Sequence, residues 1–330
     1  MKDKETILVT GGAGFIGSHL CERLLREKKK VVCLDNFSNF YPPQIKEDNI
    51  KNFKNNADFS LIRGDILDTE LLEKIFSKRS ISKIIHLAAI AGVRQSLANP
   101  SSYIDIDIKG TVNLLEAAKK YKIAHFIFGS SSSVYGTGSR IPFREDEKNT
   151  IPVSPYAASK LSAEIFCQTY TKLYKIPTTI LRFFTVYGPR QRPEMAIHKF
   201  TRLIRQGKSL TQFGSGESVR DYTFIDDVIE GVVKSMQKKF SFEVFNLGNS
   251  KTVRLSKMIK TIGERLGIEP KISKTPDRLG DVPITCADIS KAKKMLGWKP
   301  EVSFEQGVER FVNWYLEKEK FLNLWLSTKK

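Results

Sequence analysis

A tyrosine and a lysine lie four residues apart near the middle of the chain, at Tyr156 and Lys160. The segment from Pro155 to Tyr174 predicts a helix, which would place both side chains on one face, one turn apart. An ammonium group at that distance stabilises the phenolate of a tyrosine. The spacing therefore predicts that Tyr156 acts as a general base, although Tyr-x-x-x-Lys alone is a short pattern.

A run of serines, 130–133, precedes this helix and follows the apolar segment His125–Phe128. The apolar segment is short enough for a buried strand, and Gly136 and Gly138 indicate a loop soon after it. In an open parallel sheet, ligands bind where strands end and loops begin. We expect one of these hydroxyls to hold the oxygen on which Tyr156 acts.

The strongest local motif lies near the N-terminus, where Thr6–Thr10 predicts a strand and Ser18–Glu27 a helix. Between them the chain reads Gly11-Gly12-Ala13-Gly14-Phe15-Ile16-Gly17. In a strand–turn–helix unit, Gly11 permits the tight turn, Gly14 lets the backbone approach a pyrophosphate, and Gly17 allows close helix packing. The N-terminus of the helix attracts the anion, so the motif predicts a dinucleotide site.

The next predicted strand, Val31–Asp35, ends in an acidic residue. A carboxylate about 20 residues after such glycines hydrogen-bonds the adenosine ribose and repels a 2′-phosphate, which favours NAD over NADP. A later strand, Lys83–His86, is followed by Leu87, Ala88 and Ala89, whose small side chains leave room for a flat cofactor.

Predicted strands and helices alternate over residues 1–185. The alternation predicts an α/β fold with a doubly wound parallel sheet, a Rossmann domain that binds NAD. From 186 to 330 the pattern becomes irregular and predicts a smaller mixed α/β lobe that binds the substrate, with some C-terminal segments returning to the first domain. We expect helices near 197–206, 225–236, 255–266 and 304–316 in this lobe, and a strand at 244–247.

The composition argues against several classes of partner. The chain carries 54 Lys and Arg against 36 Asp and Glu, a net charge of +18. The lysines are dispersed at predicted helix ends and tails, without the basic stripe and interleaved aromatics of a nucleic-acid binder. Apolar runs such as 84–93 are shorter than the ~18 residues of a membrane span. We therefore expect neither a nucleic-acid nor a membrane partner.

The four cysteines are Cys21, Cys33, Cys167 and Cys286. They lack Cys-x-x-Cys spacing, which predicts reduced thiols and no metal site. The N-terminal residues lead directly into a strand without the pattern of a signal peptide. These features predict a cytoplasmic protein.

Over nearly its whole length the chain resembles the extended short-chain dehydrogenase/reductase superfamily, specifically its nucleotide-sugar 4-epimerases. The segments Arg220–Val228 and Arg278–Asp281 carry this resemblance. Gly92-Val93-Arg94 and the long motif from Arg182 to Met195 are similar to UDP-glucuronate 4-epimerases. One departure is Asp107, where these enzymes usually carry Asn.

The resemblance implies an NAD-dependent epimerase that inverts C4 of a UDP-hexuronate through a 4-keto intermediate. The implied catalytic residues are Ser131, Tyr156 and Lys160. Implied cofactor contacts come from Gly11, Gly14, Phe15, Ile16, Gly17, Asp35, Asn36, Asp65, Ile66, Leu87, Ala88, Ala89, Tyr156 and Lys160. Implied substrate contacts come from Arg94, Ser132, Ser133, Thr185, Arg192, Arg220 and Arg278.

Within this picture Arg220 and Arg278 would hold the UDP diphosphate, since the planar guanidinium fits phosphate oxygens. Two further arginines, Arg94 and Arg192, suggest an additional anion such as a C6 carboxylate. The resemblance also implies a homodimer formed by the predicted helices 101–120 and 155–174.

Other activities stay open on the sequence alone. They are epimerisation of UDP-glucose or UDP-N-acetylglucosamine, decarboxylation of UDP-glucuronate and dehydration of a sugar nucleotide. A relative without catalysis, binding RNA, is a further alternative, against which the intact Ser131, Tyr156 and Lys160 argue.

Overall fold

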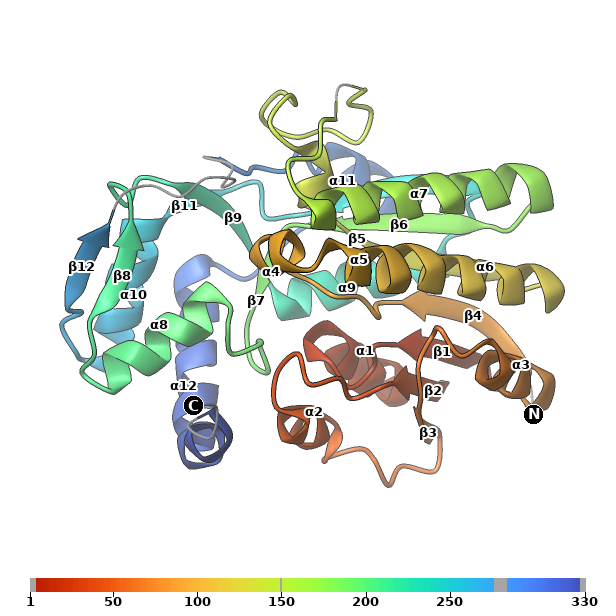
Figure 1. Cartoon of the computed structure of the whole chain (residues 1–330), viewed down its shortest axis with the longest axis horizontal. Coiled ribbons are helices and arrows are strands. Elements are labelled where there is room, and N and C mark those ends of the chain that lie inside the picture. The colour runs from red at the N-terminus through yellow and green to blue at the C-terminus, as the bar shows by residue number, and fades with distance from the viewer. Residues whose placement is uncertain (1–3, 149, 276–283, 327–330) are drawn as a thin grey trace.

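A seven-stranded sheet forms the centre of the molecule (Figure 1) in the computed structural model, which describes residues 4–148, 150–275 and 284–326. Every pair of neighbouring strands in this sheet is parallel. In spatial order the strands are β10 (Phe242–Leu247), β6 (Thr178–Phe183), β5 (His125–Ser131), β4 (Ile81–His86), β1 (Thr6–Thr10), β2 (Lys30–Asp35) and β3 (Phe59–Arg63). The order reverses between β1 and β4, as in a Rossmann fold, and confirms the predicted fold class.

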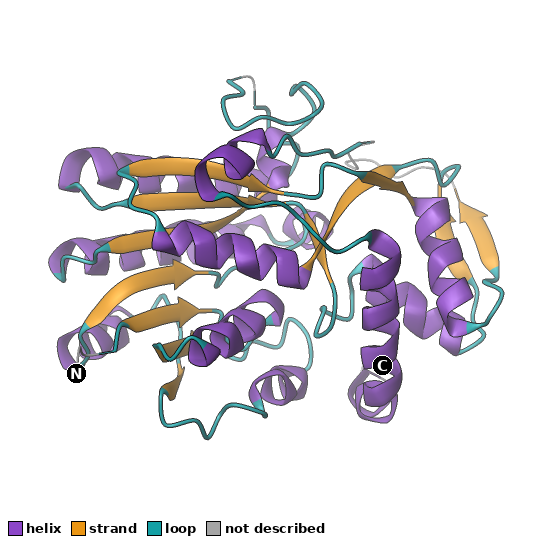
Figure 2. Ribbon diagram, turned by 180° about the vertical axis from the view of Figure 1, so that it is seen from behind, coloured by secondary structure: helices purple, strands orange, loops and turns teal. Residues whose placement is uncertain are grey.

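Helices cover both faces of the sheet (Figures 1 and 2). One face carries α3 (Thr69–Lys78), α6 (Gly110–Lys120) and α7 (Pro155–Tyr174), and the other carries α1 (Phe15–Arg26), α9 (Ile225–Gln237) and α11 (Ser290–Leu296). Successive strand residues point to opposite faces, so Ile7 and Val9 enter one hydrophobic core while Leu8 enters the other. Both faces are therefore buried, which explains why successive residues such as Ile7, Leu8 and Val9 are all apolar.

A smaller mixed lobe lies beside one end of the sheet, on the left of Figure 1. It contains a three-stranded sheet and a two-stranded sheet. Its strands are β7 (Thr185–Tyr187), β9 (Val219–Phe224), β11 (Thr252–Arg254), β8 (Leu210–Phe213) and β12 (Ile272–Thr275), and its helices are α8 (Ala196–Arg205), α10 (Leu255–Leu266) and α12 (Phe304–Leu326). This arrangement confirms the predicted second lobe.

Two predicted segments belong elsewhere in the structure. Strand β10 and helix α9, which we expected in the second lobe, belong to the large sheet and its helical layer, and Val244 of β10 pairs with Ile180 of β6. Hydrophobic patterning identifies a strand without identifying the sheet that it joins. The boundary after residue 185 stays a prediction.

The predicted helix 101–120 consists of three parts. They are α5 (Pro100–Tyr103), a π-helical segment η1 (Ile104–Lys109) and α6. The hydroxyl of Thr111 donates to the carbonyl oxygen of Asp107 (2.5 Å), so a side chain takes part at the junction between η1 and α6. Such π-turns are frequent at functional sites.

Short elements complete the rim of the large sheet. They are α2 (Pro43–Ile50), α4 (Val93–Ala98) and the 3₁₀ turn η2 (Ser132–Tyr135). In the described ranges, none of the helices combines the length and the apolar character that crossing a lipid bilayer requires.

Candidate active site

A cavity of about 690 Å³ opens at the carboxyl ends of the parallel strands and extends to the start of β7. Its walls include every residue for which the sequence predicts a cofactor contact: Gly11, Gly14, Phe15, Ile16, Gly17, Asp35, Asn36, Asp65, Ile66, Leu87, Ala88, Ala89, Tyr156 and Lys160. The walls also include Ser131, Ser132, Ser133, Thr185 and Arg192. The fold thus brings these residues of the large sheet and the second lobe to one space.

The glycine-rich turn forms a cradle with no room for side chains. Gly11 has φ of +68°, and a Cβ there would lie 2.7 Å from the backbone nitrogen of Ala88. A Cβ on Gly17 would lie 2.2 Å from the carbonyl oxygen of Gly11. This close approach of loop, helix and neighbouring strand leaves the N-terminus of α1 open to an anionic group such as a pyrophosphate.

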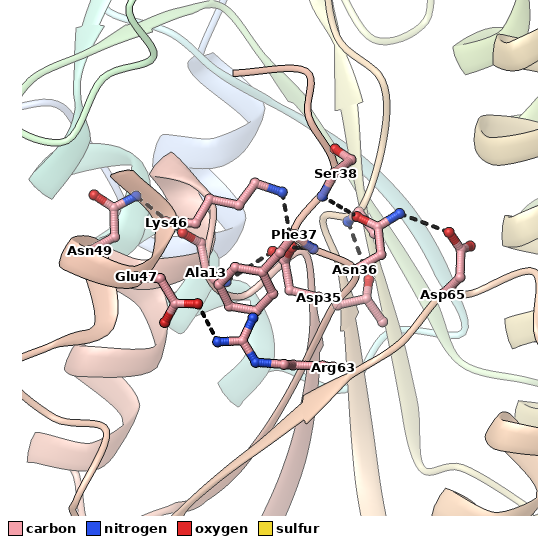
Figure 3. A network of polar contacts seen from close by, with 12 residues as sticks. Ala13, Asp35, Asn36, Phe37, Ser38, Lys46, Glu47, Asn49, Arg63 and Asp65 are labelled. Carbon is pink, nitrogen blue, oxygen red and sulfur yellow. Dashed lines mark hydrogen bonds and ion pairs between the residues drawn. The ribbon is translucent and has the colours of Figure 1, made fainter. Parts of the chain in front are cut away.

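Asp35 forms the centre of a polar network at one end of the cavity (Figure 3). Its carboxylate accepts hydrogen bonds from the Lys46 ammonium (2.9 Å) and from the backbone N–H groups of Phe37 (2.8 Å) and Ala13 (3.1 Å). A carboxylate offers about four acceptor positions, so these three donors leave one for a ribose hydroxyl. The positive charge of Lys46 offsets part of the negative charge of Asp35. The repulsion of a 2′-phosphate that we expected from Asp35 is weakened accordingly.

Further polar and aromatic contacts surround this network. Asn36 donates to Asp65 (2.7 Å), while the guanidinium of Arg63 stacks on the ring of Phe37 at 4.1 Å and pairs with Glu47. Sequence reasoning missed Lys46, because no motif spacing marks a lysine eleven residues after Asp35.

Tyr156, Lys160 and Ser131 come from α7 and from the end of β5. The Lys160 ammonium donates to the carbonyl oxygen of Gly129 (3.3 Å) and lies over the ring of Phe128. The hydroxyl of Ser131 accepts from the backbone N–H of Ser133 (3.2 Å). The three predicted catalytic side chains therefore line one cavity, and two of them, Lys160 and Ser131, hydrogen-bond the neighbouring backbone.

Three buried polar side chains hold the ends of β5 and β6 in place. Ser130 donates to the Glu164 carboxylate (2.5 Å), which also receives two hydrogen bonds from Arg182 of β6 (2.7 and 3.0 Å). These contacts connect α7 to β5 and β6 at the first residue of the serine run. They therefore fix the position of the hydroxyls relative to the helix that carries Tyr156.

His86 plays a similar part at the end of β4. Burial, followed by the charge of Lys160, lowers its pKa to about 3, so the ring is neutral. Because the Thr111 hydroxyl gives its proton to the Asp107 carbonyl, it accepts from His86 Nε2 (3.0 Å). His86 Nδ1 then accepts from Thr10 (2.7 Å), whose oxygen accepts from the Ala88 amide (3.2 Å). This series of hydrogen bonds fixes the loop after β4 against η1.

A second, smaller cavity of about 140 Å³ adjoins the first and shares Val93, Ser132, Ser133 and Thr185 with it. Arg220 of β9 lines only this smaller cavity. Because Thr185 pairs with Tyr222 in the three-stranded sheet, β7 and β9 bring the hydroxyls and the guanidinium together. The smaller cavity offers hydroxyl donors and a cation, which suit an anionic or hydroxylated ligand.

The remaining predicted arginines lie in different places. Arg192 lines the large cavity, where it pairs with Glu194 (3.2 Å) and stacks on the ring of Phe40. Arg94 is exposed on α4 and lines neither of the two cavities formed by the described residues. Arg278 lies outside the described residues.

Asp221 fixes the strand that carries Arg220. Its buried carboxylate accepts from the backbone N–H groups of Asn249 (2.6 Å), Ser250 (3.0 Å) and Ala287 (3.0 Å). These contacts tie β9 to the loop after β10 and to the segment that follows residue 283. Sequence reasoning singled out the neighbouring arginine and did not foresee this role.

The chain matches known proteins along most of its length. Residues 8–311 match the model of the GDP-mannose 4,6 dehydratase family. A UDP-glucuronate 4-epimerase from Thermodesulfobacterium geofontis is 42% identical over 311 residues, which cover 94% of this chain and 96% of that one.

Solved structures agree with these matches. A UDP-glucuronic acid 4-epimerase from Bacillus cereus, in complex with UDP-glucuronic acid and NAD, is 41% identical with a TM-score of 0.90, covering 94% of this chain and 99% of that one. A UDP-glucose 4-epimerase from Thermotoga maritima, with UDP-glucose, is 35% identical with a TM-score of 0.88, covering 95% and 99%. The chain therefore belongs to the GDP-mannose 4,6 dehydratase family of extended short-chain dehydrogenases/reductases, as a relative of its UDP-glucuronate 4-epimerases.

Proposed function

We propose that this protein is an NAD-dependent epimerase that inverts C4 of UDP-glucuronate to give UDP-galacturonate. The observation that carries this proposal is the single large cavity, which joins the glycine cradle and Asp35 to Ser131, Tyr156, Lys160 and Thr185. A redox-neutral epimerisation needs this continuity, because the sugar carbon must lie beside the cofactor during both halves of the reaction.

The residues present fit NAD. The Cβ-free cradle of Gly11, Gly14 and Gly17 would hold the pyrophosphate, and Asp35 with Asn36 would hold the adenosine ribose. Lys160 at the other end of the cavity would hold the nicotinamide ribose. The chemistry supplied by bound NAD is reversible hydride transfer at C4, so the substrate passes through a 4-keto sugar without a second redox partner.

The side chains at the centre of the cavity would transfer the proton of the sugar hydroxyl O4. Tyr156, as the phenolate, removes the proton of O4 and later returns it, and the Lys160 ammonium stabilises that phenolate. The Ser131 hydroxyl hydrogen-bonds O4 and passes the proton. Since the 4-keto sugar must turn between the two transfers, the hydroxyls of Ser132, Ser133 and Thr185 would hold the carboxylate during this rotation.

The substrate's diphosphate would bind the arginines of the second lobe. Arg220 lies in the smaller cavity beside Thr185, within reach of a ligand that extends from the centre of the large cavity. We assign the diphosphate to Arg220 together with Arg278.

We further infer a homodimer formed by η1, α6 and α7. Helices α6 and α7 lie side by side (Figure 1), and Ile104, Ile165 and Phe166 are 57%, 56% and 39% exposed. On α6, Leu115 is fully buried in the core of its own chain and Val112 is half-buried, so the exposed apolar side chains of this surface come from η1 and α7. The four thiols are free, which supports a cytoplasmic location.

Incubation with UDP-glucuronate, without added NAD, tests this function. NMR spectroscopy should show UDP-galacturonate as the product, and the reverse reaction should start from UDP-galacturonate. Conversion of UDP-glucose or UDP-N-acetylglucosamine alone would replace the proposed substrate, and release of CO₂ as the main outcome would make the protein a decarboxylase.

A further inference from the structure

Asp107 is a buried carboxyl group next to the proposed catalytic residues. It lies on the π-helical segment η1 and is 1% exposed. Its Oδ1 atom accepts a hydrogen bond from the backbone N–H of Ile90 (3.0 Å), and its Oδ2 atom lies 3.1 Å from the hydroxyl oxygen of Ser159. Ser159 is the residue directly before Lys160 on α7, so any charge on Asp107 acts on the catalytic helix.

The Ser159 hydroxyl has two close neighbours that would both need a proton from it. Its hydroxyl oxygen lies 2.9 Å from the carbonyl oxygen of Tyr156 and 3.1 Å from Asp107 Oδ2. Both neighbours of the hydroxyl are acceptors if Asp107 is ionised, but a hydroxyl has one proton to donate. If Oδ2 carries a proton, Asp107 donates to Ser159 Oγ, and Ser159 donates to the Tyr156 carbonyl. Only the protonated form satisfies both contacts with full hydrogen bonds.

The surroundings of Asp107 favour the same form. Burial raises its pKa, against the opposing effects of the Lys160 charge and of the hydrogen bonds from Ile90 and Ser159. Of the other titratable groups on the elements around it, Tyr103 of α5 interacts with Asp107, while Tyr156 lies on α7 and His86 of β4 is connected to the Asp107 backbone through Thr111. His86 is neutral, and the Tyr103 hydroxyl donates its proton to the Gly92 carbonyl (3.0 Å), so neither supplies a compensating charge.

We propose that Asp107 is held as the neutral carboxylic acid and donates its proton to Ser159 Oγ, which leaves the Lys160 charge unopposed from this side. Asp107 is then a positioning residue that fixes Ser159, the Ile90 amide and the electrostatics of Lys160. An ionised carboxylate here would weaken the stabilisation of the Tyr156 phenolate. Only this consequence for Tyr156 rests on the proposed function, since the protonation state is independent of the reaction.

Infrared spectroscopy of the whole protein in D₂O tests the protonation state directly. The wild-type spectrum minus that of Asp107→Asn should contain the C=O stretch of a carboxylic acid at neutral pH. Asp105→Asn is the matched control, because Asp105 lies exposed on the same π-helical segment and should contribute a carboxylate band. A carboxylate band in the Asp107 difference spectrum would overturn the proposal.

A second variant keeps the test valid if Asp107→Asn does not fold. Ser159→Ala removes the acceptor of the proposed acid proton. The acid C=O stretch should then move to higher frequency, as it does when a carboxylic acid loses its hydrogen-bond partner. A change confined to the carboxylate bands would contradict a neutral Asp107.

Stability measured against pH gives an answer independent of both spectroscopy and turnover. A carboxyl that ionises on unfolding but stays protonated when folded weakens folding by up to about tenfold in the equilibrium constant for each pH unit above 4. Asn lacks this penalty. The Tm advantage of Asp107→Asn over wild type should therefore grow with pH up to the folded-state pKa. A Tm difference that stays constant above pH 4 would indicate a carboxyl that is ionised in the folded and the unfolded state alike, and would overturn the proposal.

The pH dependence of turnover tests the consequence for Lys160. Asp107 should be neutral over the pH range in which the rising limb of the kcat/KM profile lies. The Asp107→Asn variant should then show that limb at the same pH as the wild type. If Asp107 opposes Lys160 as a carboxylate, the substitution should move that limb to lower pH, and the proposal fails. Absence of epimerase activity in the wild type would overturn the proposed function while leaving the infrared and stability results intact.

Discussion

The dinucleotide end of the cavity and its sugar end are built from different kinds of structure. The dinucleotide end takes most of its walls from the loops that follow strands of one parallel sheet and from the helices packed beside them, and it includes the local motifs 11–17 and 156–160. The sugar end joins η2, β7 and β9, which come from two sheets and from distant parts of the chain. The cofactor site is therefore a property of the common fold, whereas the proposed substrate site depends on how the second lobe meets the sheet.

The strongest test of the shared centre is Tyr156→Phe. The ring keeps its edge contact with Tyr103 but loses the hydroxyl that exchanges the O4 proton. We expect turnover to fall at least a hundredfold, within the range of about 10²–10⁴ typical of a general base. UDP-sugar affinity, measured by calorimetry, should change little, because binding comes from the diphosphate and uridine. Retention of more than a few per cent of activity would remove Tyr156 from this role.

A single added methyl group should prevent dinucleotide binding at the glycine-rich turn. In Gly11→Ala the new Cβ would meet the Ala88 backbone nitrogen at 2.7 Å. Gly207→Ala is the matched control, because Gly207 has a similar φ of +65° but no atom within 4 Å of the added Cβ. We expect the dinucleotide recovered from denatured Gly11→Ala protein to fall about tenfold or more, while Gly207→Ala retains it. Equal recovery from both variants would show that the cradle does not hold the pyrophosphate.

Much of the dinucleotide end could be predicted from the sequence because its residues follow the ends of predicted parallel strands or lie in short motifs. Parallel strands bring their carboxyl ends to one edge, so Gly11, Asp35 and Ser131 meet once the strand order is right. Lys46 escaped prediction, since its ion pair with Asp35 depends on the position of α2, which no motif marks.

The sugar end was predicted only from the family resemblance. The meeting of Thr185 and Arg220 depends on the pairing of β7 with β9, and sequence patterns do not specify which short strands pair. The π-helical segment at 104–109 was also missed, because its apolar spacing is compatible with a regular helix. Asp107 was noticed in the sequence only as a departure from the usual Asn.

A smaller effect is expected from Thr185→Val at the sugar end. Oxidation at C4 makes a hexuronate prone to lose CO₂ when its C5–carboxylate bond stands perpendicular to the ketone. A hydroxyl that bonds the carboxylate keeps it out of that alignment. We expect a severalfold slower epimerisation, on the scale of the net contribution of one hydrogen bond, about 0.5–1.5 kcal/mol. The fraction released as UDP-pentose should rise.

Thr185→Ser is the matched control for this test, since it keeps the hydroxyl and loses the methyl group. Its ratio of UDP-galacturonate to UDP-pentose should stay close to that of the wild type. If Thr185→Val also leaves both the rate and the ratio unchanged, Thr185 only packs or bonds the local backbone.

The smallest effect on chemistry is expected from a change on the surface behind the cavity. Ile165→Glu places a charge on the exposed face of α7, where burial against a second copy would be costly. Light scattering should show a monomer for this variant and a dimer for the wild type. Leu324→Glu on α12, a residue 61% exposed, should remain a dimer. A monomeric wild type at micromolar concentration would contradict the proposed interface.

The fate of the hydrogen at C4 tests most directly whether both ends of the cavity serve one reaction. UDP-glucuronate carrying deuterium at C4 should give UDP-galacturonate that retains the deuterium at C4, in ordinary water and without added NAD. Retention is expected because the hydrogen would leave and return as a hydride, which does not exchange with water while it is bound to carbon. Loss of the label to solvent during conversion to UDP-galacturonate would contradict hydride transfer, and with it the account of this cavity.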